Sequence, residues 1–413
     1  MGPDPSSLRV LVLHNNDFAH LDRDRGDFAS RADVENAARG IAAALRARGH
    51  RAELLGVDGD SLAELLAGLR AAPPDLVFNL CESLCGDSRN EVVVPSLLEL
   101  SGVPYTGSGP LALGLALRKD RAKELLHARG VPTPESVTLE SPEVRGPLPQ
   151  FPVIVKPTRE DASVGISAGS VVRDRAALAA AVARVLDELS QPALVERFIE
   201  GRELYVSLLG NEPPRALPFH EIDFSSLPPE LPRIVSYSGK WDTASVEFAG
   251  TRPTRCLLDE PTRLRVEEAA RAAFAALELR DYGRVDVRLA ADGTPYVIDV
   301  NPNCDLTEGA GFSRAAAYGG FDYPGLVEQV CRIALERHAH ERRYALDAVA
   351  ENPAAPAATD APDGDRLVAI DVGQHAAALA AGPPRARGAD RERRAVHGGG
   401  GAVRARADRR RAR

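Results

Sequence analysis

A hairpin pattern is the feature of this 413-residue sequence that most restricts its fold, and it spans residues 284–303, RVDVRLAADGTPYVIDVNPN. Two runs of alternating apolar and polar residues are joined through Asp292-Gly293, a dipeptide typical of tight turns between antiparallel strands. Successive side chains of a strand point to opposite faces of the sheet. The pattern therefore predicts an antiparallel strand pair with one apolar face and one polar face.

The polar face of this predicted hairpin carries residues that are unusual inside strands. Arg284, Asp286 and Arg288 share a face of the first strand, and Asp299 and Asn301 share a face of the second. Asp and Asn are depleted in strand interiors, so their presence needs an explanation. Two carboxylates and an amide oxygen are hard ligands that suit Mg²⁺, with water and phosphate completing its coordination. The alternative interpretation is an ordinary polar strand face in contact with solvent.

The order of apolar runs and helical patterns predicts an α/β chain with several domains. RVLVLHN and DLVFNL alternate with helical patterns such as VENAARGIAAALRARG, which predicts a doubly wound parallel sheet. FPVIVKP, SAGSVV, ALVERFI and ELYVSLLG resemble strands and DRAALAAAVARVLDEL a helix, which predicts a small α+β unit. We expect an N-terminal doubly wound domain at 8–118, a central α+β lobe at 119–215, a C-terminal α+β lobe with the hairpin at 216–345, and a disordered Ala/Pro/Gly/Arg-rich tail at 346–413.

Composition disfavours several classes of protein. The formal charge is −8, but the segment from Pro383 onward is strongly basic, which is compatible with a nucleic-acid or membrane contact or with a disordered, solvated extension. The segment has no aromatic residue to stack on a base, so we favour disorder and expect no nucleic-acid or membrane partner. No apolar run of eighteen residues and no signal-peptide pattern occur, so a cytoplasmic location is expected. The five scattered cysteines, at positions 81, 85, 256, 304 and 331, indicate buried thiols rather than disulfides or a zinc site.

A second group of polar residues lies in the central segment. Lys156 ends the apolar run FPVIVKP and is followed by a loop that contains Ser163 and Gly165. A lysine can hold a phosphate as a point charge, and a glycine lets backbone N–H groups approach it. Glu196 and Glu203 flank a glycine turn in LVERFIEGREL. The sequence has no Walker-type loop, and a solvated lysine with two surface acids is the alternative interpretation.

Taken in order, these segments resemble those of a known family. VPYTGSG, LRKDRAKELLHARGVPTP, VIVKPTREDASVGIS, VERFIEGREL, GRVDVRL and VIDVNPN are similar to motifs of the ATP-grasp ligases, and within them of the D-alanine:D-alanine ligases, over residues 8 to 342. The resemblance implies an ATP-grasp fold with an N-terminal doubly wound domain and two α+β lobes that hold ATP and Mg²⁺ or Mn²⁺ between them. It also implies that a substrate carboxylate is phosphorylated before an amine attacks the acyl phosphate.

The resemblance assigns a role to each matched position. It implies the following roles: Lys119 and Lys156 bind phosphate with the Ser163–Gly165 loop, Glu196 lies beside adenine, Glu203 binds ribose, Lys240 in YSGKWD closes over the γ-phosphate, Asp286, Asp299 and Asn301 hold the metal, and Arg284 steadies the acyl phosphate and the tetrahedral intermediate. Asp299 stands where the family usually has Glu. Transfer of a phosphoryl group depends mainly on positioning and on neutralisation of charge, which agrees with these roles.

The positions implied to contact substrate depart from the family pattern. Ala162 and Trp241 stand where the family has a serine and a tyrosine that lock an acid near the first helix, and that acid's motif is also missing. Asp305 occupies the position of an oxyanion-hole glycine, and Ala310-Gly311 occupies that of a Ser-Leu pair. We therefore take Trp241, Asp305, Ala310 and Gly311 as candidate substrate residues.

Three functions remain open from the sequence. The first is an ATP-dependent carboxylate:amine ligase for an amino acid or peptide other than D-alanine, the second a true D-alanine:D-alanine ligase of cell-wall precursor synthesis, and the third a non-catalytic ATP-binding regulator. The retained Arg284 argues against the third, because binding alone needs no group that stabilises an intermediate. Small-molecule carboxylates and amines are the expected partners, and the resemblance implies a homodimer.

Overall fold

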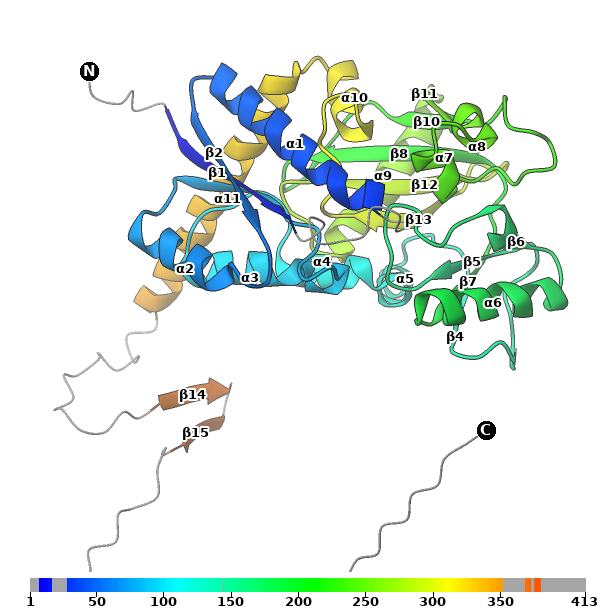
Figure 1. Cartoon of the computed structure of the whole chain (residues 1–413), viewed down its shortest axis with the longest axis horizontal. Helices are drawn as coiled ribbons and strands as arrows, with labels where there is room; N and C mark the ends of the chain where they lie inside the picture. The colour runs from blue at the N-terminus through cyan, green and yellow to red at the C-terminus, as the bar shows by residue number, and fades with distance from the viewer. Residues whose placement is uncertain (1–6, 17–27, 144, 352–367, 373–374, 380–413) are drawn as a thin grey trace, which may run out of the picture. The chain divides into compact units, whose positions relative to one another are not determined.

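The computed structural model describes residues 7–16, 28–143, 145–351, 368–372 and 375–379. It divides into two compact units, residues 1–348 and 349–413, which are treated separately below (Figure 1). The elements of the first unit, in chain order, are β1 (Arg9–Asn15), α1 (Phe28–Ala47), β2 (Arg51–Val57), α2 (Leu62–Ala71), β3 (Leu76–Leu80), the 3₁₀ helix η2 (Ser88–Val92), α3 (Val93–Ser101), α4 (Pro110–Leu117), α5 (Lys119–Ala128), β4 (Ser136–Leu139), β5 (Val153–Pro157), η3 (Ala168–Ser170), β6 (Val171–Val172), α6 (Arg175–Leu189), β7 (Ala193–Arg197), β8 (Arg202–Leu209), β9 (Arg215–Ala216), β10 (His220–Asp223), α7 (Tyr237–Trp241), α8 (Val246–Gly250), β11 (Arg252–Arg255), α9 (Glu260–Ala276), β12 (Tyr282–Leu289), β13 (Pro295–Asn301), α10 (Gly311–Tyr318) and α11 (Tyr323–Glu351).

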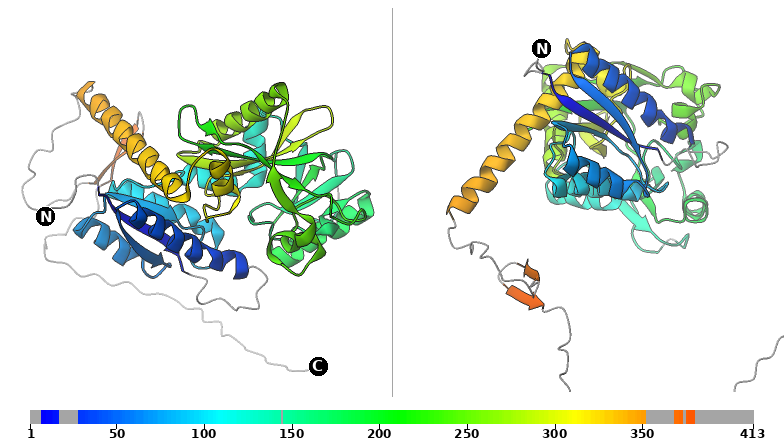
Figure 2. Two further views of the ribbon diagram at one scale, coloured as in Figure 1. Left: turned by 90° about the horizontal axis from the view of Figure 1, so that it is seen from above. Right: turned by 60° about the vertical axis from the view of Figure 1, so that its left-hand side comes forward.

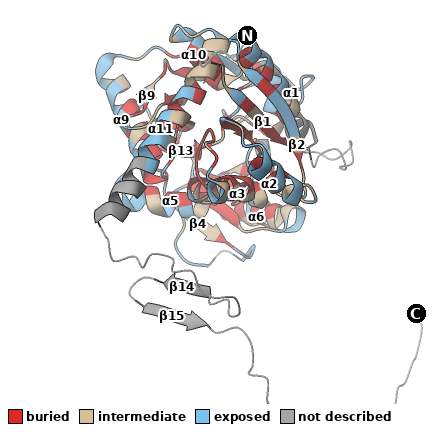
Figure 3. Ribbon diagram, turned by 90° about the vertical axis from the view of Figure 1, so that its left-hand side faces the viewer, coloured by how far each residue is buried: buried red, intermediate tan, exposed pale blue. Residues whose placement is uncertain are grey.

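The N-terminal sheet is parallel, as its buried apolar runs predict. Its strand order is β2-β1-β3, and helices cover both faces. Apolar residues of α1 and α11 pack on one face, while those of α2 and α3 pack on the other (Figures 1 and 2). The central strand β1 is largely buried and the edge strand β2 largely exposed (Figure 3). The sequence did not indicate that α11, far along the chain, would cover this sheet.

Two antiparallel sheets follow. The smaller has the order β4-β7-β5-β6 and packs against α6, while the larger runs β11-β10-β8-β12-β13, with β9 paired to β8. The strand β8 was expected in the central lobe, but it pairs with β10, β12 and β9 in the larger sheet. Alternation of apolar residues identifies a strand without naming its partner, which is why this assignment was wrong. Half of SAGSVV forms the 3₁₀ helix η3, and only Val171 and Val172 lie in a strand.

The predicted hairpin is formed by β12 and β13. Asp286 lies opposite Asp299, and Arg284 lies opposite Asn301. The pairing shifts register after Asp286, where Val287 lies opposite Val297. The resulting bulge reverses which side chains of β13 face the core, because an extra residue changes the alternation. As a consequence Val297 is fully buried in the core while Asp299 lines a cavity on the opposite face.

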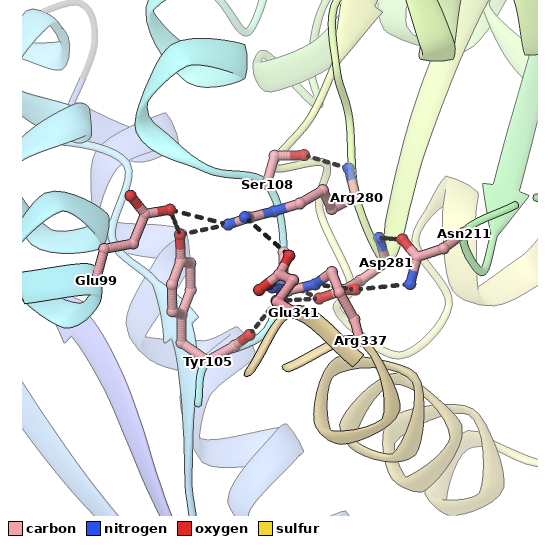
Figure 4. Close-up of polar contacts among 9 residues, drawn as sticks. Glu99, Tyr105, Ser108, Asn211, Arg280, Asp281, Arg337 and Glu341 are labelled. Carbon is pink, nitrogen blue, oxygen red and sulfur yellow. Dashed lines mark hydrogen bonds and ion pairs between the residues drawn. The ribbon is translucent and has the colours of Figure 1, made fainter. Parts of the chain in front are cut away.

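A buried polar network joins three segments of the first unit (Figure 4). Asp281, fully buried just before β12, accepts hydrogen bonds from Arg337 Nε at 2.9 Å and from the Gly107 amide at 3.0 Å. Arg337, on α11, also donates to the Tyr105 carbonyl at 2.8 Å. The Arg280 guanidinium lies 5.3 Å from the centroid of the Tyr105 ring. The network therefore ties α11 and the N-terminal domain to the residues just before β12.

Arg337→Met should lower the free energy of unfolding by about 3 kcal/mol, because removing one partner of a buried ion pair leaves the Asp281 carboxylate uncompensated. Arg332→Met on the same helix is the matched control, since the Arg332 side chain is 61% exposed and its ion pair with Glu336 lies at the surface. Urea unfolding of both variants measures the difference. Equal midpoints for the two variants would show that the network does not stabilise the fold.

The second unit contains a hairpin of β14 (Val368–Val372) and β15 (His375–Leu379). The expectation that residues 346–413 lack regular structure is wrong for these strands and for the last turn of α11, which runs to Glu351. The basic segment from Pro383 lies outside the described residues. Among the described residues, no helix is long and apolar enough to cross a membrane. All five cysteines are free, and four of them are buried as expected, whereas Cys85 is exposed.

Candidate active site

Most residues predicted for the site line one cavity of about 870 Å³. The predicted residues on its walls are Lys119, Lys156, Ser163, Glu196, Glu203, Lys240, Arg284, Asp286, Asp299, Asn301, Asp305, Ala310 and Gly311. Trp241 lines a smaller adjoining cavity of about 180 Å³ that shares Lys240, Arg284 and Asp305 with the first. Gly165 lines neither cavity. Gly165 has a φ of +75°, and a Cβ there would approach Leu189 Cδ1 to 2.7 Å. Any other residue at this position of the loop would therefore be strained and would collide with Leu189.

Lysine is concentrated in this site. Only four of the 51 Lys and Arg residues are lysines, and three of them, Lys119, Lys156 and Lys240, line the large cavity. The fourth, Lys123, contacts Glu196 at 3.0 Å. Arginine supplies the positive charge everywhere else in the chain. A compact ammonium with three donors suits a group that must adjust to phosphate oxygens, so this distribution indicates a phosphate-handling site.

Glu196 is a buried acid in the wall of the large cavity. It is 1% exposed, and its two carboxylate oxygens contact Lys123 at 3.0 Å and Lys156 at 2.9 Å. Burial disfavours its ionised form, but the two ammonium groups outweigh burial and lower the pKa of Glu196. Lys123 was not identified from the sequence, although it lies four residues after Lys119 on the same face of α5.

Lys119 and Asp299 form the second ion pair of the cavity. The Lys119 ammonium donates to both oxygens of Asp299, at 2.9 and 3.0 Å, and to Asp161 at 3.2 Å. Burial opposes charge on Asp299, but the Lys119 ammonium prevails and lowers the pKa of this carboxyl. Burial likewise opposes charge on Lys119, and Asp299 and Asp161 outweigh it and raise the pKa of the lysine.

Arg284 and Asp286 form a two-pronged pair on the same strand. Arg284 donates from Nε to Asp286 Oδ1 at 2.7 Å and from Nη2 to Oδ2 at 3.0 Å. Burial, which outweighs the attraction of Arg284, raises the pKa of Asp286. The Arg284 guanidinium also lies 4.8 Å from the Tyr205 ring centroid. These contacts fix the orientation of the Arg284 guanidinium in the cavity wall.

The donor set expected for a metal ion fits a hard cation. Asp286 and Asp299 face each other across the hairpin, and Asn301 Nδ2 lies 3.4 Å from Asp286 Oδ2. Two carboxylates and one amide, with remaining positions left to water and phosphate oxygens, match the ligands that Mg²⁺ prefers. Within the described residues, no cluster of three or more His, Cys, Asp or Glu forms a self-sufficient metal site. Any ion here would therefore depend on oxygens from a bound phosphate.

A further ion pair, between Glu203 and Arg288, lines another part of the cavity. Glu203 contacts Arg288 Nη2 at 2.8 Å and accepts a hydrogen bond from the Tyr205 hydroxyl at 3.1 Å. Arg288 lies 5.1 Å from the ring of Phe198, which also lines the cavity. The sequence indicated Glu203 and the position of Arg288 but not that they pair across β8 and β12. An acid beside aromatic and apolar walls is a suitable contact for the hydroxyls and flat base of a nucleoside.

Lys240 and Trp241 lie where the two cavities meet. The Lys240 ammonium is 5.1 Å from the Trp241 ring centroid, and Trp241 Nε1 donates to the Ala162 carbonyl at 3.1 Å. Partial desolvation by the cavity walls, followed by the charge of Arg284, lowers the pKa of Lys240, although the residue as a whole is exposed. Ser163 donates to the Val235 carbonyl at 3.0 Å, which joins the same loop to the segment before α7. These contacts connect the loop after β5 to the helix that carries Lys240.

The smaller cavity contains a buried acid that the sequence did not single out. Glu91 is 8% exposed and accepts a hydrogen bond from Asn303 Nδ2 at 3.2 Å. Burial, followed by the charges of Asp161 and Glu82, raises the pKa of Glu91 well above 4.5. A raised folded-state pKa contributes stability below the unfolded pKa, and that stability is lost as the pH rises through the folded pKa.

Glu91→Gln should therefore unfold at a higher temperature than the wild type above pH 5, and the difference should grow with pH. The expected gain is about 1.4 kcal/mol for each unit by which the folded pKa is raised. Thermal unfolding at pH 5 and pH 8 measures it, with the exposed Glu64→Gln on α2 as control. If the difference in unfolding temperature between Glu91→Gln and wild type is the same at pH 5 and pH 8, the pKa of Glu91 is not raised.

The chain is similar in sequence to known proteins. The family model described as "D-ala D-ala ligase C-terminus" matches residues 128–332. An uncharacterized protein, y4sG, of Sinorhizobium fredii is 37% identical over 307 residues, covering 72% of this chain and 87% of that protein. The D-alanine–D-alanine ligase of Chromohalobacter salexigens is 35% identical, covering 64% and 79%, and that of Desulforudis audaxviator is 32% identical, covering 72% and 92%.

Solved structures are similar in fold. The D-alanine–D-alanine ligase of Bacillus anthracis in complex with ATP superposes with a TM-score of 0.61 at 21% identity, covering 81% of this chain and all of that one. The fold and the cavity define an ATP-grasp ligase, an enzyme that uses ATP to form a C–N bond. Within that class, the chain belongs to the D-alanine–D-alanine ligase family.

Proposed function

We propose that this enzyme phosphorylates a substrate carboxylate with ATP and joins the resulting acyl phosphate to an amine other than D-alanine. The observation that carries the reaction class is the convergence of Lys119, Lys156, Lys240 and Arg284 on one cavity beside two facing carboxylates. Positive groups fixed in advance around a transferring phosphoryl group are the main requirement for this chemistry.

The proposed roles follow the positions of the groups in the cavity. Lys156 and Glu196 would lie beside the base and inner phosphates, and Glu203 would bind the ribose. Lys240 would contact the terminal phosphoryl group, and Arg284 would face the acyl phosphate and the oxyanion formed when the amine attacks. Asp286, Asp299 and Asn301 would hold Mg²⁺, which neutralises phosphate charge when bound.

The argument against D-alanine as substrate concerns the walls beyond the phosphate groups. Ala162 has no side-chain hydrogen-bonding group, and its carbonyl accepts from the Trp241 indole, so this pair cannot present two hydroxyls to an acid. Asp305 lines both cavities, where a carboxylate near a developing oxyanion would raise its energy unless it contacts a cationic substrate group. These features support a substrate region that differs from that of the D-alanine–D-alanine ligases.

D-Alanine–D-alanine ligation is the second candidate, because curated relatives with that name are 32–35% identical to this chain. Purified protein incubated with ATP, Mg²⁺ and pooled amino acids, in parallel with D-alanine alone, separates the two. We expect ADP and phosphate release with the pool and none above background with D-alanine. Formation of D-alanyl-D-alanine at a comparable rate would establish the second candidate, and no ADP release in either mixture would contradict both.

A further inference from the structure

Tyr205, on β8 of the larger sheet, contacts two residues of the proposed site that have different roles. Its hydroxyl donates to Glu203 Oε1 at 3.1 Å, and the centroid of its ring lies 4.8 Å from the Arg284 guanidinium carbon. Glu203 is the acid proposed to bind ribose, and Arg284 is the arginine proposed to face the acyl phosphate. One side chain therefore connects the nucleoside contact of the site to its reacting centre.

The pairing of β8 with β12 brings these groups to one face of the sheet. Tyr205 lies directly opposite Asp286. Residues two positions apart on a strand share a face, so Glu203 and Tyr205 both reach the large cavity from β8. Arg284 and Asp286 reach the same cavity from β12 in the same way. The contacts of Tyr205 thus depend on strand pairing between segments far apart in the chain.

The Tyr205 ring and Asp286 hold the Arg284 guanidinium in different ways. Asp286 accepts two hydrogen bonds from it, from Nε at 2.7 Å and from Nη2 at 3.0 Å. Hydrogen bonds to one carboxylate leave the guanidinium free to pivot about that carboxylate. An aromatic ring against the guanidinium attracts its charge and opposes this movement. The ring therefore fixes the direction in which the charge of Arg284 points.

The Tyr205 hydroxyl orients the Glu203 carboxylate. Glu203 is 6% exposed, and its Oε2 contacts Arg288 Nη2 at 2.8 Å while its Oε1 accepts the Tyr205 hydrogen bond. Burial, followed by the charges of Glu203 and Asp286, raises the pKa of Tyr205, so its hydroxyl remains a donor at neutral pH. Without this donor, the Arg288 guanidinium would be free to take both carboxylate oxygens, which is the pairing that arginine prefers. Glu203 would then turn away from the cavity.

A neighbouring histidine supports the Tyr205 ring. His220 lies opposite Tyr205 on β10, and the two rings pack edge to face, with centroids 5.0 Å apart and an angle of 84° between their planes. Burial, followed by the charges of Arg284 and Arg314, lowers the pKa of His220 to about 3, so the imidazole is neutral and does not repel Arg284 at neutral pH. Gly311 leaves room for the imidazole, because a Cβ there would come within 3.1 Å of His220 Nε2. These contacts restrict the position of the Tyr205 ring.

We propose that Tyr205 is a positioning residue for two groups of the site: its ring holds Arg284 toward the acyl phosphate, and its hydroxyl holds Glu203 toward the ribose of ATP. This inference rests on the proposed ligase function, from which the roles of Arg284 and Glu203 are taken. The two parts of the side chain can be removed separately. Phenylalanine keeps the ring and removes the hydroxyl, whereas leucine removes both.

Steady-state kinetics of the full-length protein separate the two roles, with ATP, Mg²⁺ and the amino acids that support ADP release. Tyr205→Phe should raise the KM for ATP by about three- to tenfold and keep kcat within about twofold of wild type, because the ring stays against Arg284. Tyr205→Leu should raise this KM by a similar factor and also lower kcat by at least about tenfold. Tyr205→Met is a second ring-free variant with the same expected kcat, for use if the leucine variant does not fold.

Tyr318 provides the matched controls. Its ring centroid lies 5.8 Å from the Arg255 guanidinium carbon, and it lines neither cavity of the site. Tyr318→Phe and Tyr318→Leu should therefore keep the kcat and the KM for ATP of the wild type. Circular dichroism at the assay temperature shows which variants are folded.

Three results would overturn the inference while the wild type is active. A kcat within about threefold of wild type in the ring-free variants would show that Arg284 does not need the ring. An unchanged KM for ATP in Tyr205→Phe would show that the hydroxyl does not position Glu203. Equal losses of kcat in Tyr205→Phe and Tyr205→Leu would contradict the division of roles between ring and hydroxyl. No ADP release by the wild type in any amino-acid mixture would instead reject the ligase function on which the inference rests.

Discussion

Lys240→Met should reduce the rate of ADP release by about 10²- to 10³-fold and change the free energy of unfolding by less than about 0.5 kcal/mol. The ammonium lies against the Trp241 ring and has no carboxylate within ion-pair distance among the described residues, so its removal leaves no buried charge unpaired. The interaction that is lost is the proposed contact between the Lys240 ammonium and the phosphoryl group during its transfer. Steady-state kinetics and thermal unfolding on the same preparation measure both quantities.

Lys240→Arg is the informative comparison for this variant. Arginine restores the positive charge but replaces a compact ammonium with a planar group, so we expect partial recovery of kcat. A variant Lys240→Met with kcat within about threefold of wild type would show that this lysine does not contact the reacting group. A large fall in stability would show that it holds the fold instead.

Glu196→Gln should have the largest effect on stability, lowering the free energy of unfolding by about 4 kcal/mol. The reason is that both Lys123 and Lys156 would lose the carboxylate that compensates their charges in a buried region. Adding Lys123→Met should restore part of this loss, because the double variant removes a second buried charge that has become unpaired. Urea unfolding of the single and double variants measures the coupling. A loss below about 1 kcal/mol in the single variant would contradict the assignment.

The lowered pKa of Glu196 also predicts how the free energy of unfolding changes at acid pH. Its pKa is lowered in the folded state, so it contributes stability above the unfolded pKa, and that stability is lost as the pH falls through the folded pKa. Asp299 has the same sign, because the Lys119 ammonium lowers its pKa despite burial. We therefore expect the wild type to lose stability below about pH 4.5, the ordinary value for Glu. Glu196→Gln should show a shallower loss over the same range.

The sequence identified residues that line the cavity better than it identified their surroundings. Lysines, acids and the hairpin are local signals, and their resemblance to ATP-grasp motifs implied that Lys156, Arg284 and Asp299 would meet in one site. The bulge after Asp286 has no such signal, and strict alternation would have placed Val297 beside Asp299. Pairing of β8 with β10 and β12 is equally invisible, because it depends on segments far apart in the chain.

His220, Arg314 and Lys123 were missed for a related reason. A single histidine on the buried face of a short strand resembles an ordinary core residue, and one arginine among many in a chain rich in arginine attracts no attention. Their meaning depends on what faces them, such as Gly311 opposite His220 and Glu196 opposite Lys123. Lys123 had one readable signal, its position four residues after Lys119 on α5.

Isotope transfer tests the proposed reaction most directly. Amino acids that support ADP release are labelled with ¹⁸O in the carboxyl group, and the phosphate formed is examined by mass spectrometry. Attack of a carboxylate oxygen on the γ-phosphorus, followed by amine attack on the acyl carbon, leaves that oxygen in the phosphate. We predict one ¹⁸O in each phosphate released when the donor is labelled. Release of unlabelled phosphate, or of AMP and pyrophosphate, would contradict an acyl phosphate intermediate.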